Sequence, residues 1–350
     1  MAILKKSAIK TAAAISVSTL LQTGHASESP IPQDSAQSYH QQAAWQEIQQ
    51  FLPERLQLDL GNLPLERIWE WQGHQVHLDR YLNPSSKVRV ILLHGVGTNG
   101  RQMSLIVGAP LARHGYETVA IDLPNYGLTQ VDSNHPVRYD DWVQLVSDFI
   151  DAELQRDPRP IVLYGLSAGG MLAYHAAAKN RKVAGIIGMT FLDQRFQRVR
   201  DETARNLLMS RVGIPFAEVA AHTPLAGIKL PMTLVSKMSA LVNDPNALKA
   251  FLADKTSAGN WASLRFLASY ENYVPLLEPS EFDVCPILLT QPAEDHWTPL
   301  PLSKLVLDQV HKVPVTIVEL EGAGHYPVED RGLQQLETAI VVFLEGIQPE

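Results

Sequence analysis

The chain has 350 residues, 45% of them hydrophobic and 19% charged, and its 37 acidic and 29 basic residues give a formal charge of -8. This length and apolar content can support one large domain with a substantial core, or a domain with an insertion. The acidic balance and the lack of a basic, aromatic-interleaved run argue against a nucleic-acid partner. Cys285 is the single cysteine, which excludes an intramolecular disulfide and a cysteine-rich metal site. We expect Cys285 to be a buried small hydrophobe at the start of a strand.

The N-terminus has the composition of a secretory signal peptide. Three lysines precede an uncharged run over residues 11–21, and the small residues Gly24 and Ala26 follow. This order is typical of a basic segment, an apolar segment and a cleavage site. The run is much shorter than the about 20 apolar residues that a membrane-spanning helix needs, so we expect no stable membrane span. We predict that residues 1–26 direct export to the periplasm or the medium, with an amphipathic helix as the alternative.

The remaining chain alternates short apolar runs with helix-like stretches. A polar, helical stretch over residues 35–51 precedes two β-patterned segments, 67–71 and 75–78, which we expect to form a hairpin. Short apolar strands that alternate with helices imply a mostly parallel sheet covered on both faces, an α/β fold. Further strands are predicted at 88–93, 118–121, 161–164, 183–192, 286–290 and 315–320, and helices at 102–113, 139–155, 171–178, 302–310 and 333–347.

Residues 193–274 interrupt this alternation. The strand signal disappears there, and the sequence reads as helices separated by breaks at proline residues. We interpret this block as a helical cap inserted after the sixth strand of a core formed by residues 65–192 and 275–350. Residues 27–64 then form an N-terminal helical extension.

Apolar residues in the cap recur at helical spacing. They could pack on the rest of the domain, or part of this face could line an acyl-sized pocket above the sheet, since ligands bind at the carboxyl ends of parallel strands. The residues concerned are Leu207, Leu208, Met209, Leu234, Val235, Met238 and Leu241.

An apolar strand over residues 161–164 runs into the motif Gly-x-Ser-x-Gly and then into a helix-forming stretch. Gly165 and Gly169 allow a tight turn between strand and helix, which makes the Ser167 hydroxyl project from the sheet. This pattern is typical of a nucleophile elbow, and it makes Ser167 the candidate nucleophile. Chance produces such a short pattern fairly often, so its meaning depends on residues elsewhere in the chain.

An alcohol is a weak nucleophile at neutral pH, so a catalytic serine needs an imidazole to take its proton and a carboxylate to orient that imidazole. Among 12 histidines, His325 lies in a glycine-flanked loop directly after the last predicted strand. Asp295 lies in the loop after the preceding strand. We predict His325 as the general base and Asp295 as the acid, with Glu294 and Asp193 as alternative acids.

Acyl transfer also needs two backbone N–H groups for the oxyanion, whose loss in comparable sites costs about 2.7 to 4 kcal/mol. An elbow supplies one of them from the residue after the nucleophile, here Ala168. The glycine-rich loop over residues 94–100 is the expected source of the second, with Val96 as the donor. Because this loop lacks the spacing of the common phosphate-binding motifs, a nucleotide site is disfavoured. We expect His94 to brace the loop by hydrogen bonds.

The glycine-rich loop, the elbow, the acid and the base, in that order, resemble the α/β-hydrolase family over residues 65–350. Residues 122–129 are similar to the family's D-x-P-G-x-G-x-S loop, with Asn125 in place of a glycine and Thr129 in place of a serine. Within the family, the capped serine esterases, monoacylglycerol lipases and lysophospholipases are the most similar. The resemblance implies hydrolysis of carboxylic esters through a covalent acyl-enzyme on Ser167.

Several reactions share this triad. A serine nucleophile argues against dehalogenases and epoxide hydrolases, which use a carboxylate, but peptidase, thioesterase, lactonase and carbon-carbon bond hydrolase chemistry stay open. A non-catalytic binding protein on a hydrolase scaffold is the alternative of another class. We expect a small-molecule ester with an apolar acyl or alcohol group as the partner, and no metal or other cofactor.

Overall fold

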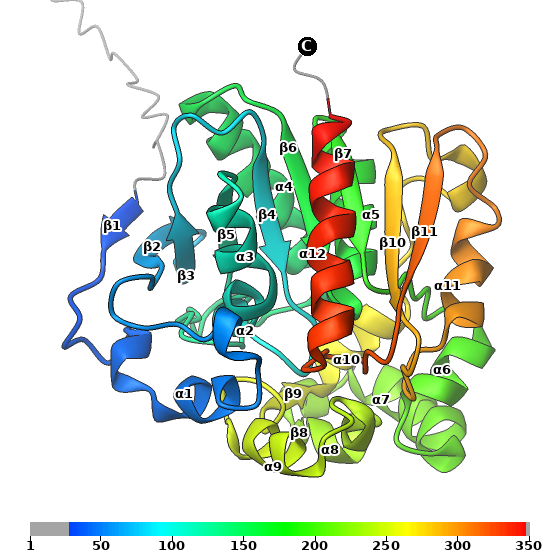
Figure 1. Cartoon of the computed structure of the whole chain (residues 1–350). Helices are drawn as coiled ribbons and strands as arrows, with labels where there is room; N and C mark the ends of the chain where they lie inside the picture. The colour runs from blue at the N-terminus through cyan, green and yellow to red at the C-terminus, as the bar shows by residue number, and fades with distance from the viewer. Residues whose placement is uncertain (1–27, 348–350) are drawn as a thin grey trace, which may run out of the picture.

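The computed structural model describes residues 28–347, and a nine-stranded sheet lies at its centre (Figure 1). Its strands are β1 (Glu28–Pro30), β2 (Leu65–Trp71), β3 (His74–Tyr81), β4 (Arg89–Leu93), β5 (Glu117–Ile121), β6 (Ile161–Gly165), β7 (Gly185–Gly188), β10 (Ile287–Pro292) and β11 (Val315–Leu320). They follow the order β1-β2-β3-β5-β4-β6-β7-β10-β11. From β5 to β11 all neighbours are parallel, whereas β1, β2 and β3 pair antiparallel at the other edge. The predicted mostly parallel α/β class is confirmed.

Helices cover both faces of this sheet. The main ones are α1 (Ala43–Gln49), α2 (Gly100–Met103), α3 (Ala109–Arg113), α4 (Tyr139–Arg156), α5 (Ala168–Asn180), α11 (Leu300–Leu307) and α12 (Asp330–Glu345). Figure 1 shows α3 and α12 on one face, with α4 and α5 on the other. Every residue of β4 and β6 is buried, because central strands between two helical layers have no solvent-facing side.

The β2–β3 hairpin forms as expected, and its turn is tighter than predicted. Gln72 and Gly73 both have positive φ angles, 47° and 83°, which is the conformation of a two-residue type I′ turn. Such a turn matches the twist of the flanking strands, so all of β2 pairs with β3, from Leu65 with Arg80 to Trp71 with His74.

Several predicted elements differ in length or type. The helix expected over residues 102–113 contains a π-helical turn, Ser104–Gly108, because Pro110 has no N–H for a regular helical hydrogen bond. The strand expected over residues 183–192 forms only at β7, and the helix expected over residues 35–51 is reduced to one 3-10 turn and α1.

The insertion lies between β7 and β10, below the carboxyl ends of the strands in Figure 1. It follows the seventh strand along the chain and not the sixth, because the short β1 was not predicted. Its helices are α6 (Gln197–Thr203), α7 (Ile214–Ala220), α8 (Met232–Val235), α9 (Pro245–Ala253) and α10 (Leu264–Glu271). The expectation that this block is wholly helical is wrong, because β8 (Lys229–Pro231) and β9 (Trp261–Ser263) form an antiparallel pair within it.

The apolar residues of the cap divide between interior and surface. Val235, Met238 and Leu241 are buried, but Leu234 is 44% exposed. The expected single helix stops after α8, and the chain continues in a short 3-10 turn, so the four side chains do not share one face. Leu208 is 71% exposed and does not line a pocket.

Two further predictions concern Cys285 and the presence of a membrane-spanning helix. Cys285 is a buried free cysteine, and burial raises the pKa of its thiol to about 12, so the thiolate is not populated at neutral pH. Between residues 28 and 347, no helix combines the length and the apolar character needed to cross a bilayer. The predicted signal peptide lies outside the described residues.

Candidate active site

Ser167 sits in the sharp turn between β6 and α5, with φ of 55° and ψ of -123°. Few non-glycine residues adopt such a conformation, and it stores strain. The flanking glycines make the turn possible. A Cβ atom on Gly165 would lie 2.0 Å from the carbonyl oxygen of Gly169, and one on Gly169 would lie 2.2 Å from that of Leu93. The local geometry is therefore that of the predicted nucleophile elbow.

The structure brings the predicted acid and base into contact. Nδ1 of His325 lies 2.9 Å from Oδ2 of Asp295, and both side chains are buried. The loop after β10 holds the carboxylate in a tight turn, in which Oδ1 of Asp295 accepts the backbone N–H groups of Trp297 and Thr298 at 2.9 and 2.7 Å. A carboxylate fixed in this way sets both the ring orientation and the tautomer of the histidine, with the proton on Nδ1.

Burial opposes ionisation of Asp295, but the neighbouring His325 and the hydrogen bonds from Thr298 outweigh it and lower the pKa of the carboxyl to about 2. The other ring nitrogen of His325, Nε2, is buried and has no hydrogen-bond partner among residues 28–347. The structure thus contains no hydrogen bond between Ser167 and His325. Catalytic hydrogen bonds are often long in ligand-free structures and tighten only in the substrate complex.

Sequence reasoning did not single out Thr298. Its hydroxyl donates to Oδ2 of Asp295 at 2.7 Å and lies 3.0 Å from Nδ1 of His325. Trp297 packs beside the imidazole, with ring centroids 4.7 Å apart. The sequence signal that could have identified Thr298 is an aspartate followed three residues later by threonine in a loop. This spacing allows the side chains to close a turn.

Neither alternative acid contacts His325. Glu294 is exposed, next to Asp295 in the same loop. Asp193 is buried and forms an ion pair with Arg195, with Nη2 to Oδ2 at 2.6 Å. Geometry therefore favours Asp295.

The glycine-rich loop after β4 packs against the elbow. A Cβ atom on Gly95 would lie 2.8 Å from Cβ of Ser167 and 3.4 Å from the backbone nitrogen of Ala168. This close approach places Val96, the next residue, at the cavity that Ser167 also lines. The predicted oxyanion donors, Val96 and Ala168, thus belong to two segments that meet at the nucleophile.

His94 braces this loop, as expected. Its Nδ1 lies 2.8 Å from the carbonyl oxygen of Gly95, and its Nε2 accepts the backbone N–H of Leu123 at 2.9 Å. Burial lowers the pKa of His94 to about 4, so the ring is neutral and can donate at one nitrogen and accept at the other.

The loop after β5 explains the two departures from the family motif. Asn125 has a φ of 76°, in the left-handed region that asparagine tolerates better than most residues. The Thr129 hydroxyl donates to the carbonyl oxygen of Asp122 and accepts the N–H of His77 at 2.9 Å, which serine could also do. Asp122 itself accepts the N–H groups of Gly100 and Leu128 and so ties this loop to α2.

The cavity above Ser167, called here the substrate cavity, has about 520 Å³ of space including its opening to solvent. The core contributes Val96, Ser167, Leu192, Trp297 and Thr298 to its lining. The cap contributes mainly apolar side chains, among them Ile214, Met232, Val235, Phe266 and Leu267. The cavity is therefore suited to an apolar group next to the nucleophile.

One group of buried side chains has the composition of a metal site: Glu66, His77 and Asp79 offer ligand atoms within 4.8 Å of one another. The Arg101 guanidinium already binds both oxygens of Asp79, at 2.6 and 3.0 Å. Both nitrogens of His77 face carboxylates, Glu66 at 3.2 Å and Asp122 at 3.1 Å. The protonated side chains of Arg101 and His77 thus occupy the place that a cation would take. The arrangement fits an ion-pair cluster better than a metal site.

Comparison with known proteins identifies the family. The model of the alpha/beta hydrolase family matches residues 90–339, and the chain belongs to this family. Protein phosphatase methylesterase 1 of Rattus norvegicus is 28% identical over 140 residues, 36% of this chain and 36% of that protein, so the chain aligns with about a third of the relative's length.

Two other proteins align over most of the chain. The quorum-quenching protein AidA of Acinetobacter baumannii is 21% identical over 306 residues, which cover 83% of this chain and 98% of AidA. A soluble variant of monoglyceride lipase from Saccharomyces cerevisiae, solved with a substrate analogue, has a TM-score of 0.67 at 15% identity, covering 84% of this chain and 98% of the lipase. The predicted α/β-hydrolase fold is confirmed.

Proposed function

We propose that this protein is a serine hydrolase that cleaves carboxylic esters with an apolar acyl or alcohol group. The observation that carries the proposal is the buried His325–Asp295 pair, whose partner Thr298 lines the same cavity as Ser167 and whose Nε2 has no hydrogen-bond partner within residues 28–347. A methylesterase and a monoglyceride lipase among the similar proteins support an ester as the substrate.

The proposed reaction has two halves. Ser167 Oγ attacks the ester carbonyl carbon while Nε2 of His325 takes the hydroxyl proton, and the amides of Val96 and Ala168 donate to the oxyanion. Collapse of this intermediate breaks the bond to the alcohol, which leaves with the proton from His325. Water then attacks the acyl-enzyme, again giving its proton to Nε2, and the acid is released as Ser167 is regenerated. Asp295 stays ionised and stabilises the imidazolium.

Labelling with a fluorophosphonate tests the nucleophile. We expect one covalent adduct on the wild-type protein, mapped to Ser167 by peptide mass spectrometry, and none on Ser167→Ala. Ser236→Ala is a matched control, because Ser236 lines the same cavity while its hydroxyl donates to the backbone of Met232; this variant should still be labelled. A folded wild-type protein without an adduct would instead favour the non-catalytic binding protein.

A series of 4-nitrophenyl esters from acetate to decanoate tests the apolar group. The apolar lining of the substrate cavity predicts that kcat/KM rises by about ten-fold for every two or so buried methylene groups, until the chain exceeds the cavity. A flat profile, or strict preference for acetate, contradicts this part of the proposal. Chelators should leave the rates unchanged.

We also propose that residues 1–26 direct export. The support is their composition, three lysines followed by an uncharged run and small residues. Mass spectrometry of the protein recovered from the periplasm or medium should find a new N-terminus near residue 27. Retention of the full chain in the cytoplasm contradicts the proposal.

A further inference from the structure

The lining of the substrate cavity includes one carboxyl group that the proposed mechanism does not use. Glu271, the last residue of α10, contributes to this lining and is only 7% exposed. Its neighbours along the cavity wall are apolar, among them Ile214, Val235 and Leu267. A carboxyl group in such surroundings is rare unless it has a partner, because burial removes its hydration.

Within residues 28–347, the buried Oε2 of Glu271 lacks a hydrogen-bond partner, and its ion pair with Arg200 is long. The nearest cation is Arg200, whose Nε lies 3.5 Å from Oε2 but donates to the carbonyl oxygen of Gln194 at 2.6 Å. Another Arg200 nitrogen, Nη2, donates to the backbone oxygen of Glu271 and to Asn272. The guanidinium is thus directed mainly at other acceptors.

The charge state of Glu271 follows from this environment. Burial raises the pKa of its carboxyl to about 8, with Arg200 opposing the shift and the carboxylate of Glu218 adding to it. At neutral pH the group is therefore mainly the neutral acid, which offers an O–H donor and a carbonyl acceptor. It can bind an uncharged oxygen of a ligand.

A second, apolar cavity lies behind Glu271. It is lined by Met209, Leu230 and Ala217 among others. It shares four lining residues with the substrate cavity, namely Ile214, Val235, Leu267 and Glu271. Glu271 therefore stands at the boundary between the cavity that contains Ser167 and an apolar space within the cap.

We propose that Glu271 is a specificity-determining residue that hydrogen-bonds a hydroxyl or keto oxygen carried along the substrate's chain. The apolar cavity behind it receives the part of the chain beyond that oxygen. This inference rests on the proposed ester hydrolysis and names its substrate class, an ester with a long, singly oxygenated chain. A plain methylene chain leaves the buried carboxyl without a partner, which costs about ten-fold or more in binding.

The test compares 4-nitrophenyl esters of one chain length, either plain or with a single hydroxyl or keto group at successive carbons. For the wild-type protein, kcat/KM at the best position should exceed that of the plain ester by about ten-fold or more. Glu271→Gln keeps a donor and an acceptor and should keep the preference. Glu271→Met has a similar length without hydrogen-bonding groups and should lose it, with the plain ester hydrolysed at least as fast.

Glu202→Met is the matched control, because Glu202 is an exposed carboxylate of α6 in the same cap and lines neither cavity. It should retain the wild-type preference. Each preference is the ratio of two kcat/KM values measured on one preparation, so a smaller fraction of folded protein in a variant does not change it. A wild-type protein without preference at any position, or the same preference in Glu271→Met, overturns the inference. Failure of ester hydrolysis itself is distinguishable, because it abolishes turnover of the plain esters and labelling of Ser167.

Discussion

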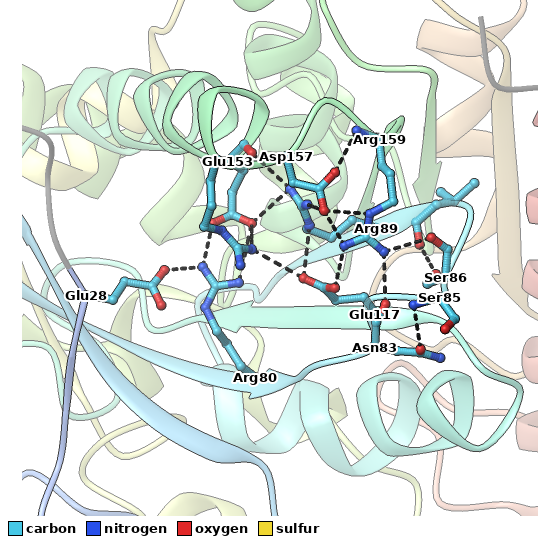
Figure 2. Close-up of polar contacts among 12 residues, drawn as sticks. Glu28, Arg80, Asn83, Ser85, Ser86, Arg89, Glu117, Glu153, Asp157 and Arg159 are labelled. Carbon is cyan, nitrogen blue, oxygen red and sulfur yellow. Dashed lines mark hydrogen bonds and ion pairs between the residues drawn. The ribbon is translucent and has the colours of Figure 1, made fainter.

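The two ends of the parallel strands differ in how their carboxylates and imidazoles are paired. At the amino ends, arginines and carboxylates form one connected network (Figure 2). Its members are Arg80, Arg89, Arg156 and Arg159, with Glu28, Glu117, Glu153 and Asp157. The four positive and four negative charges balance. At the carboxyl ends, by contrast, Ser167 has a strained backbone and Nε2 of His325 has no partner.

We interpret this difference as one between groups that stabilise the fold and groups that the proposed function requires. Glu153 is 2% exposed, and burial opposes its ionisation, but the charge of Arg80 and the hydrogen bonds around it lower its pKa. A carboxylate paired in this way is already satisfied and offers little to a ligand. At the other end, Nε2 of His325 has no hydrogen-bond partner within residues 28–347, and under the proposed function it takes the proton of Ser167. Changes at the two ends should therefore affect different measurements.

Removal of the nucleophile should have the largest effect on turnover. Ser167→Ala and Ser167→Gly should both lower kcat by about 10⁶-fold, since neither retains an attacking oxygen. Glycine tolerates φ of 55° and ψ of -123°, whereas alanine inherits the strain. We expect Ser167→Gly to exceed Ser167→Ala in unfolding free energy by about 1 kcal/mol, measured by urea denaturation. Equal stabilities would show that the elbow stores little strain.

Asp295→Asn should have the second-largest effect on turnover. The amide cannot stabilise an imidazolium and favours the wrong tautomer of His325, so we expect kcat to fall by about 10⁴-fold. Thr298→Val removes only the hydroxyl that donates to Asp295 and should cost much less, about ten-fold. Steady-state kinetics on one aryl ester measures both. A similar loss in the two variants would mean that Asp295 acts mainly by positioning.

The candidate triad could be read from the sequence because each residue follows a predicted strand. Parallel strands bring their carboxyl ends to one edge of the sheet, so Ser167, Asp295 and His325 were expected there in spite of their separation along the chain. Thr298 was missed because its role depends on the turn that Asp295 closes, which strand patterns do not describe.

The other misses have physical causes too. β8 and β9 are three residues long and β8 ends in Pro231, too short for alternation to show. The π-helical turn before α3 depends on where Pro110 falls within an otherwise helical pattern. The charge network at the amino ends joins residues such as Arg80 and Glu153, 73 positions apart, and charged side chains are usually solvent-exposed. Only tertiary structure shows that these are buried.

Glu153→Gln should break the amino-end network without changing the chemistry. Glu153 contacts Arg80 at 2.6 Å and Arg89 at 3.0 Å, so its neutralisation leaves buried cations without a full counter-charge. We expect a loss of about 3 to 5 kcal/mol in unfolding free energy, with kcat per labelled Ser167 unchanged. Glu281→Gln is the control, because Glu281 pairs with Lys312 on the surface; it should cost less than about 1 kcal/mol.

The ion-pair cluster around His77 also contains Glu66, Asp79, Arg101 and Asp122. It lies near the carboxyl end of β5, so this end of the sheet has a paired network too. Burial opposes protonation of His77, but hydrogen bonds to Asp122 and Glu66 outweigh it and raise its pKa to about 9 from an unfolded value of 6.5. Its stabilising contribution is fully present below pH 6.5 and is lost as pH rises through 9. The shift predicts a loss of roughly 3 kcal/mol over this window.

Urea denaturation of the wild-type protein and His77→Gln at pH 6.5, 8 and 9.5 measures this loss. Glu271, whose pKa is about 8, titrates in the same range, but it is common to both proteins, so the difference between the two curves isolates His77. That difference should shrink by roughly 3 kcal/mol between pH 6.5 and 9.5. A difference independent of pH would show that His77 is neutral in the folded protein. The carboxyl end of the sheet would then be less fully paired than the amino end even apart from Ser167, Asp295 and His325.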